Sequence, residues 1–234
     1  VIAPDFTSGS LVEVSCETDF SANTEHMKNF SNTVAGQVLA NSCDTEAASA
    51  DDLAAVLTQS VISDESLTVK DLLDDIISKI TESIKVSKFA RFENSNGVIN
   101  SYIHAGANLG VLVDIDVTGD RPADLTEIVN VAKDICMQVA VTNPLCIRPD
   151  QLEADVVEKE KDIYRDQLRA EGKPEQMIEK IIMGKMGKFY EGVCLENQKF
   201  IKDDKQSIKQ VLDAVAKKHN ISLSIKRYVR FAIG

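Results

Sequence analysis

Three patterns in the first part of the chain return further along it, and this internal repeat limits the folds that the chain can adopt. GSLVEV at residues 9–14 returns as GVLVDI at residues 110–115, which is 101 positions later. TVKDLLD at residues 68–74 and KFARF at residues 88–92 return as SIKQVLD and RYVRF, both 139 positions later. Because one offset relates two separate patterns, the repeat predicts two related subdomains, residues 1–97 and 98–234, which divide near Asn96 and Gly97.

Each copy combines strand and helix patterns, which indicates an α+β fold with helices packed on antiparallel sheets. Apolar, β-prone residues mark strands at residues 11–16, 84–92 and 109–115, and we expect residues 1–6 to form a hairpin with the first of them. Helical spacing covers residues 22–40, 53–61, 66–80 and 128–141. Thr18 and Asp19 are expected to cap the first of these helices, and Asp51 and Asp52 the second.

The second copy carries an insertion of about 38 residues, because the offset grows from 101 to 139 along the chain. Residues 153–195 have that size and show two apolar stripes at helical spacing, separated by EGKP at residues 171–174. Glycine followed by proline is typical of one helix ending and another beginning. The insertion therefore predicts an antiparallel, coiled-coil-like helical hairpin, whose tip either binds a partner or only closes the hairpin.

Charge and cysteine content narrow the function classes. A net charge of −11 argues against nucleic acid as a direct partner, because phosphate binding depends on clustered Lys and Arg. No apolar run reaches the roughly 18 residues of a membrane span. The five scattered cysteines without Cys-x-x-Cys predict reduced, mostly buried thiols in a cytosol-like compartment. We expect the protein to bind no metal, no cofactor and no membrane. We expect it to act in the cytoplasm or in the interior of an organelle.

Signals for enzyme chemistry are weak. The three histidines, His26, His104 and His219, show no spacing of a triad or a metal site. GKMGK at residues 184–188 lacks the spacing of a phosphate-binding loop and lies in a helical pattern. Acidic pairs at residues 74–75 and 203–204 are interpreted as solvated faces. The chain is therefore expected not to be an enzyme and not to bind nucleotide itself.

The stretch VEVSCETDF at residues 12–20 is the strongest candidate site. It begins as a strand and ends on helix-capping residues, so Phe20 lies at a strand-to-helix turn. One interpretation makes Phe20 a staple that holds the turn to the core. The other makes it a wedge that projects outward and binds another protein.

EVSCETDF at residues 13–20 resembles the signature of the elongation factor Ts family, with Ser15 and Ser21 where the family has Asn and Val. YIH at residues 102–104, VEKE at 157–160, EGKP at 171–174 and FIKDD at 200–204 also resemble family motifs. The resemblance covers essentially the whole chain and implies two core subdomains with a coiled-coil hairpin inserted in the second. The chain departs from the family at residues 105–108, where a Gly-rich loop with Arg is usual. The family's small N-terminal helical domain is also missing, which leads us to expect a truncated or processed form.

This resemblance implies a guanine-nucleotide exchange factor that promotes GDP release from elongation factor Tu. The implied partner is elongation factor Tu in both its GDP-bound and its nucleotide-free forms. The implied partner contacts are Asp19, Phe20, Ile80, Thr81, His104 and Gly106. In plainer interpretations, Ile80 belongs to the core and His104 is a turn histidine bonded to backbone. Asp19 would fix the turn that aims Phe20.

Two other function classes stay open from the residues alone. The chain is interpreted alternatively as a duplicated oligomerisation scaffold whose hairpin is a docking arm, and a homodimer is left open. A third interpretation is a small-molecule enzyme with a cleft between the subdomains. A GDP-release assay on elongation factor Tu separates the exchange factor from the scaffold, and a ligand-dependent thermal shift would reveal the enzyme.

Overall fold

The computed structural model describes residues 1–233, which form two compact units. The first unit is Val1–Ala140 together with the chain from Ala216 onward, and the second is Val141–Val215. Both contain helices and antiparallel strands, which confirms the predicted α+β class. Among the residues described, no helix is both long enough and apolar enough for a membrane span.

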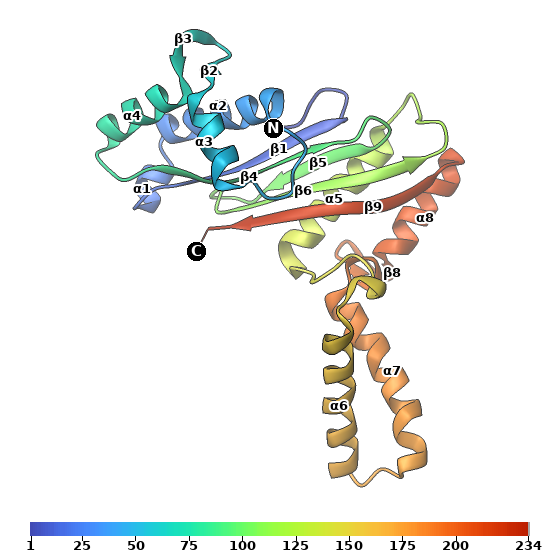
Figure 1. Ribbon diagram of the computed structural model, residues 1–234. Helices are drawn as coiled ribbons and strands as arrows, with labels where there is room; N and C mark the ends of the chain where they lie inside the picture. The colour runs from blue at the N-terminus through green and yellow to red at the C-terminus, as the bar shows by residue number, and fades with distance from the viewer. Residues whose placement is uncertain (234) are drawn as a thin grey trace. The chain divides into compact units, whose positions relative to one another are not determined.

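Two antiparallel sheets form the centre of the first unit (Figure 1). One pairs β1 (Ser8–Ser15) with β4 (Lys85–Glu93), and the other has β6 (Leu109–Thr118) between β5 (Val98–Ile103) and β9 (Ser222–Ala232). The two sheets contact each other through buried apolar side chains, namely Leu11, Ala90, Phe92, Ile99 and Leu112.

Glycine is required where the two sheets approach most closely. A Cβ at Gly9 would lie 2.8 Å from Cγ2 of Ile99, and a Cβ at Gly110 would lie 2.8 Å from Cδ1 of Leu11. Contacts this short essentially never occur between real side chains, so a larger residue at either position would force neighbouring side chains between the sheets to shift. These are the two glycines that begin the repeated GSLVEV and GVLVDI patterns.

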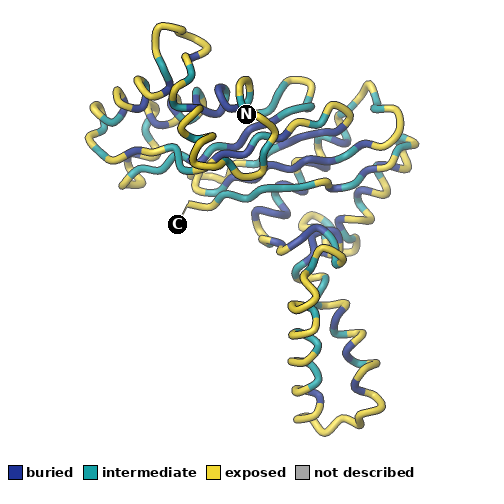
Figure 2. The backbone as a smooth tube through the Cα atoms, in the orientation of Figure 1, coloured by how far each residue is buried: buried dark blue, intermediate teal, exposed yellow. Residues whose placement is uncertain are grey.

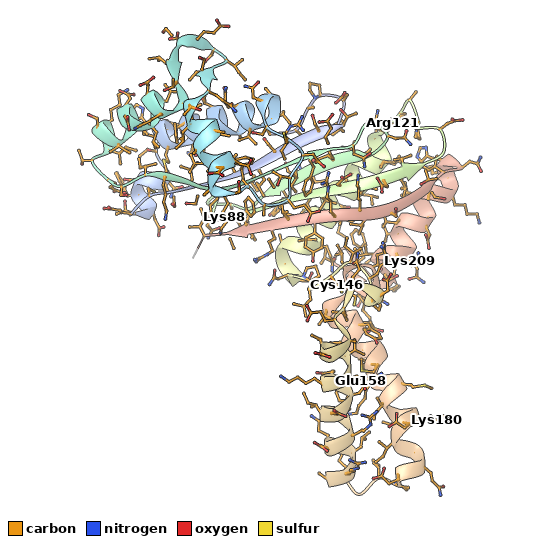
Figure 3. The ribbon with its side chains drawn as sticks, viewed as in Figure 1. Lys88, Arg121, Cys146, Glu158, Lys180 and Lys209 are labelled. Carbon is orange, nitrogen blue, oxygen red and sulfur yellow. The ribbon has the colours of Figure 1, made fainter. Side chains whose placement is uncertain are left out.

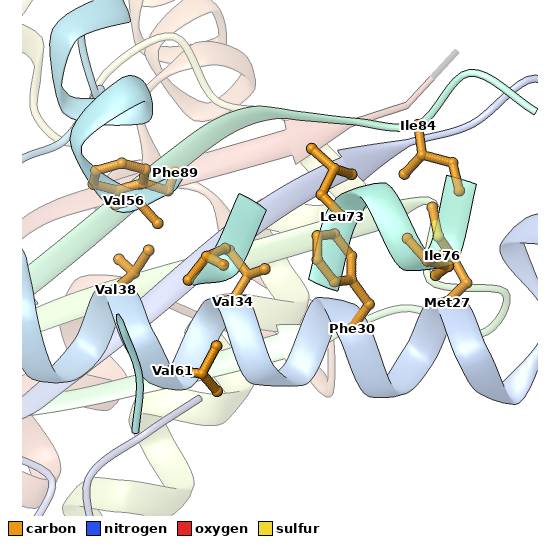
Figure 4. Close-up of a cluster of buried hydrophobic side chains, with 11 residues drawn as sticks. Met27, Phe30, Val34, Val38, Val56, Val61, Leu73, Ile76, Ile84 and Phe89 are labelled. Carbon is orange, nitrogen blue, oxygen red and sulfur yellow. The ribbon is translucent and has the colours of Figure 1, made fainter. Parts of the chain in front are cut away.

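Three helices cover the outer face of the β1–β4 sheet: α2 (Glu25–Asn41), α3 (Ala50–Thr58) and α4 (Val69–Ile80). Their apolar faces meet β4 around Phe89 in one buried cluster (Figure 4). On the other sheet, the thiol of Cys136 in α5 (Thr126–Thr142) donates to the carbonyl of Asn100 in β5. The unit is thus a layered sandwich with its buried residues along the strands and the inner helix faces (Figure 2).

The predicted N-terminal hairpin is present in part. The amino group of Val1 donates to the carbonyl of Ser10 and the N–H of Ser10 donates to the carbonyl of Val1, both at 2.8 Å, and Ile2 forms an antiparallel bridge with Gly9. Pro4 has no N–H for a strand ladder, and the chain turns immediately after it. The hydroxyl of Thr7 donates to the Asp5 carboxylate at 2.8 Å, which stabilises that turn. The hairpin pairing ends there, and along its whole length β1 pairs with β4, which lies far along the chain.

The predicted helix over residues 22–40 is α2, which begins three residues later than expected because Thr24 caps it, and a separate short helix, α1 (Asp19–Ala22), precedes it. Thr18 caps α1 and Thr24 caps α2, so Asp19 is not a cap but the first helical residue. The prediction that Asp51 and Asp52 cap the next helix is also wrong. Ser49 caps α3, and Asp52 instead completes a capping box by accepting from the Ser49 backbone.

The second unit contains the two helices expected between residues 153 and 195. They are α6 (Ala154–Ala170) and α7 (Glu175–Val193), and the chain turns between them at Gly172, whose φ is 73°. Ion pairs join Arg165 to Glu179 at 2.8 Å and Arg169 to Glu175 at 2.8 Å, which fixes an antiparallel arrangement. The buried side chains between them are Leu168, Ile178, Ile182 and Met186. Figure 3 labels Glu158 and Lys180 on these helices.

The element bounds recur at the two offsets of the repeat. β2 (Ser60–Val61), β3 (Asp64–Thr68) and α4 are followed 139 positions later by β7 (Lys199–Phe200), β8 (Asp203–Ser207) and α8 (Ile208–His219). Likewise α2 and α5 have the same length and begin 101 positions apart. Each hairpin of short strands therefore leads directly into its helix in the same way.

Candidate partner-binding site

Phe20 is the second residue of α1, and a short turn joins α1 to the end of β1 at Ser15. The backbone N–H of Ser21 donates to the Thr18 hydroxyl at 3.2 Å, which starts the helix, and Ser21 is the buried residue of its single turn. The ring of Phe20 is 84% exposed. The interpretation of Phe20 as a core staple is therefore wrong, because a four-residue helix that buries a serine turns its phenylalanine outward.

The carboxylate of Glu82 holds this turn with four hydrogen bonds. It accepts from the backbone N–H groups of Glu17 and Thr18, both at 3.1 Å. It also accepts from the hydroxyl of Thr18 at 2.7 Å and from the hydroxyl of Ser21 at 2.6 Å. These bonds, that of Ser21 foremost, hold the pKa of Glu82 below its ordinary value, because each one favours the charged carboxylate.

The two turns are joined in the opposite direction as well. The backbone N–H of Ser83 donates to the Glu17 carboxylate at 3.3 Å, so each turn supplies an acidic side chain to the other. We name residues 17–21 and 82–83 together the Glu82 clamp. It fixes the position of α1 relative to the end of α4, where Ile80 and Thr81 lie.

Ile80 and Thr81 differ in environment. Ile80 is partly buried against the α2–α4 cluster, which agrees with its plainer interpretation as a core residue. Thr81 is exposed and ends α4 in the left-handed conformation, with φ of 60°, while its N–H donates to the carbonyl of Ile77 at 2.8 Å. A β-branched residue is strained there, and such strain is typical of functional sites.

A groove of about 520 Å³ connects α1 with the turn between β5 and β6. Its lining includes Asp19, Ala22 and Asn23 from the α1 turn and Gly106 and Ala107 from the β5–β6 turn. The carbonyl of Asp19 accepts a bond of 2.8 Å from the side chain of Asn23. The structure thus brings Asp19 and Gly106 to one groove, although they are 87 positions apart in the sequence.

His104 is exposed at the start of the same β5–β6 turn. Its backbone N–H donates to the carbonyl of Leu109 at 2.9 Å, and its carbonyl accepts from Ala107. The imidazole Nδ1 contacts the hydroxyl of Tyr102 at 2.9 Å, so the side chain bonds to another side chain and not to backbone as the plainer interpretation expected. Gly106 has φ of 89°, a conformation that few other residues adopt without strain.

The resemblance placed Glu82 only within the Ile-Thr-Glu segment expected to face the partner, and sequence reasoning missed both Ser21 and the hydrogen bond by which Glu82 holds it. Their hydrogen bond joins residues 61 positions apart, and no local spacing or motif indicates it. The only available signal was that Glu82 follows the Ile80-Thr81 pair that the family resemblance had already singled out.

A family model described as Elongation factor TS matches residues 17–234 of this chain. The chain belongs to the elongation factor Ts family. Two relatives called Elongation factor Ts, from Clostridium botulinum (strain Alaska E43 / Type E3) and Chlorobaculum tepidum, are each 37% identical to it. The alignments cover 100% of this chain in both cases, and 73% and 77% of the respective relatives. Membership of the elongation factor Ts family confirms the resemblance found in the EVSCETDF motif.

Proposed function

We propose that this protein is a guanine-nucleotide exchange factor that promotes GDP release from elongation factor Tu. Family membership supports this function over that of an oligomerisation scaffold. The observation that carries the mechanism is the exposed ring of Phe20 on a turn fixed by the Glu82 clamp. An exposed aromatic residue on a rigid support is the usual form of an interface anchor, because little entropy is lost when it binds.

Exchange of this kind requires no bond chemistry in the exchange factor. The factor binds the nucleotide-free partner more tightly than the nucleotide-bound one, and by linkage it lowers the partner's affinity for GDP by the same ratio. In our proposal Phe20 enters elongation factor Tu beside its switch helix. This shifts the groups that hold Mg²⁺ and the phosphates, and GDP then leaves.

The other site residues divide into contacts and supports. We propose that Asp19, Ile80, Thr81, His104 and Gly106 contact elongation factor Tu around the Phe20 ring. The groove that joins Asp19 to Gly106 supports a single continuous surface for them. Glu82 is a positioning residue, because its carboxylate is occupied by the clamp.

We further infer that residues 1–97 and 98–234 are duplicated subdomains. Both copies have a strand irregularity at the same place, between Glu13 and Val14 in β1 and between Asp114 and Ile115 in β6, 101 positions later. An arginine from the last strand of each copy also bonds to the end of the equivalent helix. Arg91 donates to the carbonyl of Leu39 in α2, and Arg230 donates to the carbonyl of Ala140 in α5.

In this duplication only the first copy has an aromatic side chain at the position of Phe20. Arg121 stands 101 positions after Phe20, and its guanidinium donates to the carbonyls of Asp5 at 2.6 Å and Gly97 at 3.2 Å. Arg121 thus has a structural role, because these two hydrogen bonds attach its turn to the backbone at Asp5 and Gly97. In our proposal α6 and α7 form a coiled-coil arm on the second copy, and the protein acts in the cytoplasm without direct contact to nucleic acid.

The test is release of fluorescent GDP from elongation factor Tu with and without this protein. We expect a large acceleration with the wild type, its loss in Phe20→Ala, and its retention in Ile62→Ala, which truncates another exposed apolar side chain of the same unit. No acceleration by a folded wild-type protein would favour the scaffold. Full activity of Phe20→Ala would remove the wedge mechanism and leave the family assignment unchanged.

A further inference from the structure

Cys146 and Cys194 form a buried pair of thiols in the second unit. Their sulfur atoms are 3.4 Å apart, with the thiol of Cys146 donating to that of Cys194, although 48 positions separate them in the sequence. Cys194 is fully buried and Cys146 is 9% exposed. The partner-binding site uses neither residue, and Figure 3 labels Cys146.

The backbone around the pair already has the spacing of a disulfide. Cys146 and Cys194 are partners in a parallel β-bridge, and the N–H of Leu195 donates to the carbonyl of Cys146 at 2.9 Å. Paired extended segments lie about 4.8 Å apart. Disulfides span Cα separations of about 4.4–6.8 Å, so small side-chain rotations would bring the sulfurs to about 2.05 Å without moving the backbone.

We propose that Cys146 and Cys194 are a modification site that forms an intramolecular disulfide on exposure to a hydroperoxide. The sulfur of Cys146, the less buried residue of the two, attacks the peroxide oxygen and becomes a sulfenic acid while the first water or alcohol leaves. The sulfur of Cys194 then attacks the sulfur of Cys146, and the sulfenic hydroxyl leaves as water. Two thiols are oxidised by two electrons, and one peroxide bond is reduced.

The disulfide would join the two ends of the α6–α7 hairpin. Cys146 lies before α6, and Cys194 is the residue at which α7 ends. All of the hairpin therefore lies inside the loop that the bond would close. Closing a loop of this length restricts the unfolded chain and stabilises the folded second unit.

The surroundings of Cys194 keep its thiol reduced in the absence of an oxidant. Burial is the main effect that raises the pKa of the Cys194 thiol to about 12, so this thiol stays protonated at neutral pH. Because the thiolate is the nucleophile, the protonated Cys194 thiol is not the sulfur that meets the peroxide first, and it reacts once a sulfenic acid has formed beside it on Cys146. Cys43 is exposed and serves as an internal comparison for ordinary surface reactivity.

The test uses the full chain, reduced, freed of reductant and treated with hydrogen peroxide. Free thiols are counted in denaturant, and peptide mass spectrometry identifies the linked residues. We expect two of the five thiols to disappear with the loss of two hydrogen atoms, and a peptide that links Cys146 to Cys194. Dithiothreitol should restore both thiols, and the Tm of the oxidised chain should exceed that of the reduced one.

Matched variants separate this bond from other oxidation. Cys146→Ser and Cys194→Ser should each abolish the linked peptide and the peroxide-dependent rise in Tm, while Cys43→Ser should keep both. Recovery of Cys146 and Cys194 as free thiols after a peroxide dose that oxidises Cys43 would overturn the proposal. Their conversion to sulfinic acids without a cross-link, or a disulfide to a different cysteine, would overturn it equally.

Discussion

The hydroxyl of Thr18 donates a hydrogen bond of 2.7 Å to the carboxylate of Glu82. This bond joins the turn that carries Phe20 to the end of the helix that carries Ile80 and Thr81. An aromatic anchor is effective only where its support is rigid, since ordering a mobile turn on binding would cost free energy. In our proposal the Glu82 clamp therefore determines how strongly Phe20 acts on elongation factor Tu.

Glu82→Gln should slow exchange while the protein stays folded. The glutamine side chain keeps the size of glutamate but has one acceptor oxygen in place of two, so it cannot accept all four bonds. We expect GDP release from elongation factor Tu to slow by roughly tenfold, within the usual range of coupling between sites. Glu65→Gln, at an exposed carboxylate of β3, is the control and should leave the rate unchanged. Wild-type exchange by Glu82→Gln would show that the clamp does not position the ring.

The stability that Glu82 contributes should depend on pH in one direction. Its hydrogen bonds to Ser21 and Thr18 lower the folded pKa below the ordinary value of 4.5, so the contribution is fully present above that value. It is lost as the pH falls through the lowered pKa. The difference in Tm between wild type and Glu82→Gln should thus be constant from about pH 8 to pH 5 and shrink at lower pH. A difference that grows on acidification would contradict this assignment.

Phe20→Ala should leave the protein's own stability nearly unchanged, within about 0.5 kcal/mol, because the ring is 84% exposed. Its cost should appear at the interface, at about 2–4 kcal/mol of binding free energy. Phe89→Ala is the matched control, since that ring is buried in the α2–α4 cluster and its loss should cost about 3–5 kcal/mol of folding free energy. Denaturant unfolding and binding to nucleotide-free elongation factor Tu measure the two effects. A large loss of stability in Phe20→Ala would show that Phe20 holds the turn to the core and is not an interface anchor.

Thr81→Asn should stabilise the protein. Thr81 has φ of 60°, which a β-branched residue adopts with strain, whereas Asn220 ends α8 at the equivalent repeat position with φ of 55°. Asparagine tolerates this conformation, so we expect a gain of about 1 kcal/mol in the free energy of unfolding. Thr81→Val keeps the branching and should give no such gain. Equal stabilities of Thr81→Asn and Thr81→Val would show that backbone strain is not the cause.

Replacing residues 155–193 with a short turn should leave the first unit folded. The apolar side chains of α6 and α7 that are buried, Leu168, Ile178, Ile182 and Met186, pack in a cluster of hairpin residues. Their loss removes no side chain from the sheets of the first unit. We expect a single cooperative unfolding transition by circular dichroism. Loss of that transition would show that the hairpin is required for the core fold.

Local patterns predicted the regular elements because helix and strand periodicity is a property of neighbouring residues. The strand at 84–92, the helix through Leu72 and Leu73, and the two helices of the insertion all occur close to their expected positions. The caps were less predictable. Several Ser, Thr and Asp residues compete for each helix start, and backbone geometry selects Thr18, Thr24 and Ser49 among them.

The sequence by itself determined the elements, the repeat, the family and the position of Phe20 at a turn. Only the tertiary structure decided that β1 pairs with β4, that the Phe20 ring is exposed, that Glu82 holds Thr18 and that Cys146 meets Cys194. These contacts join residues tens of positions apart and depend on side-chain positions within a few ångströms. Periodicity specifies which face of an element is apolar, but which partner that face meets is fixed by packing of the whole chain.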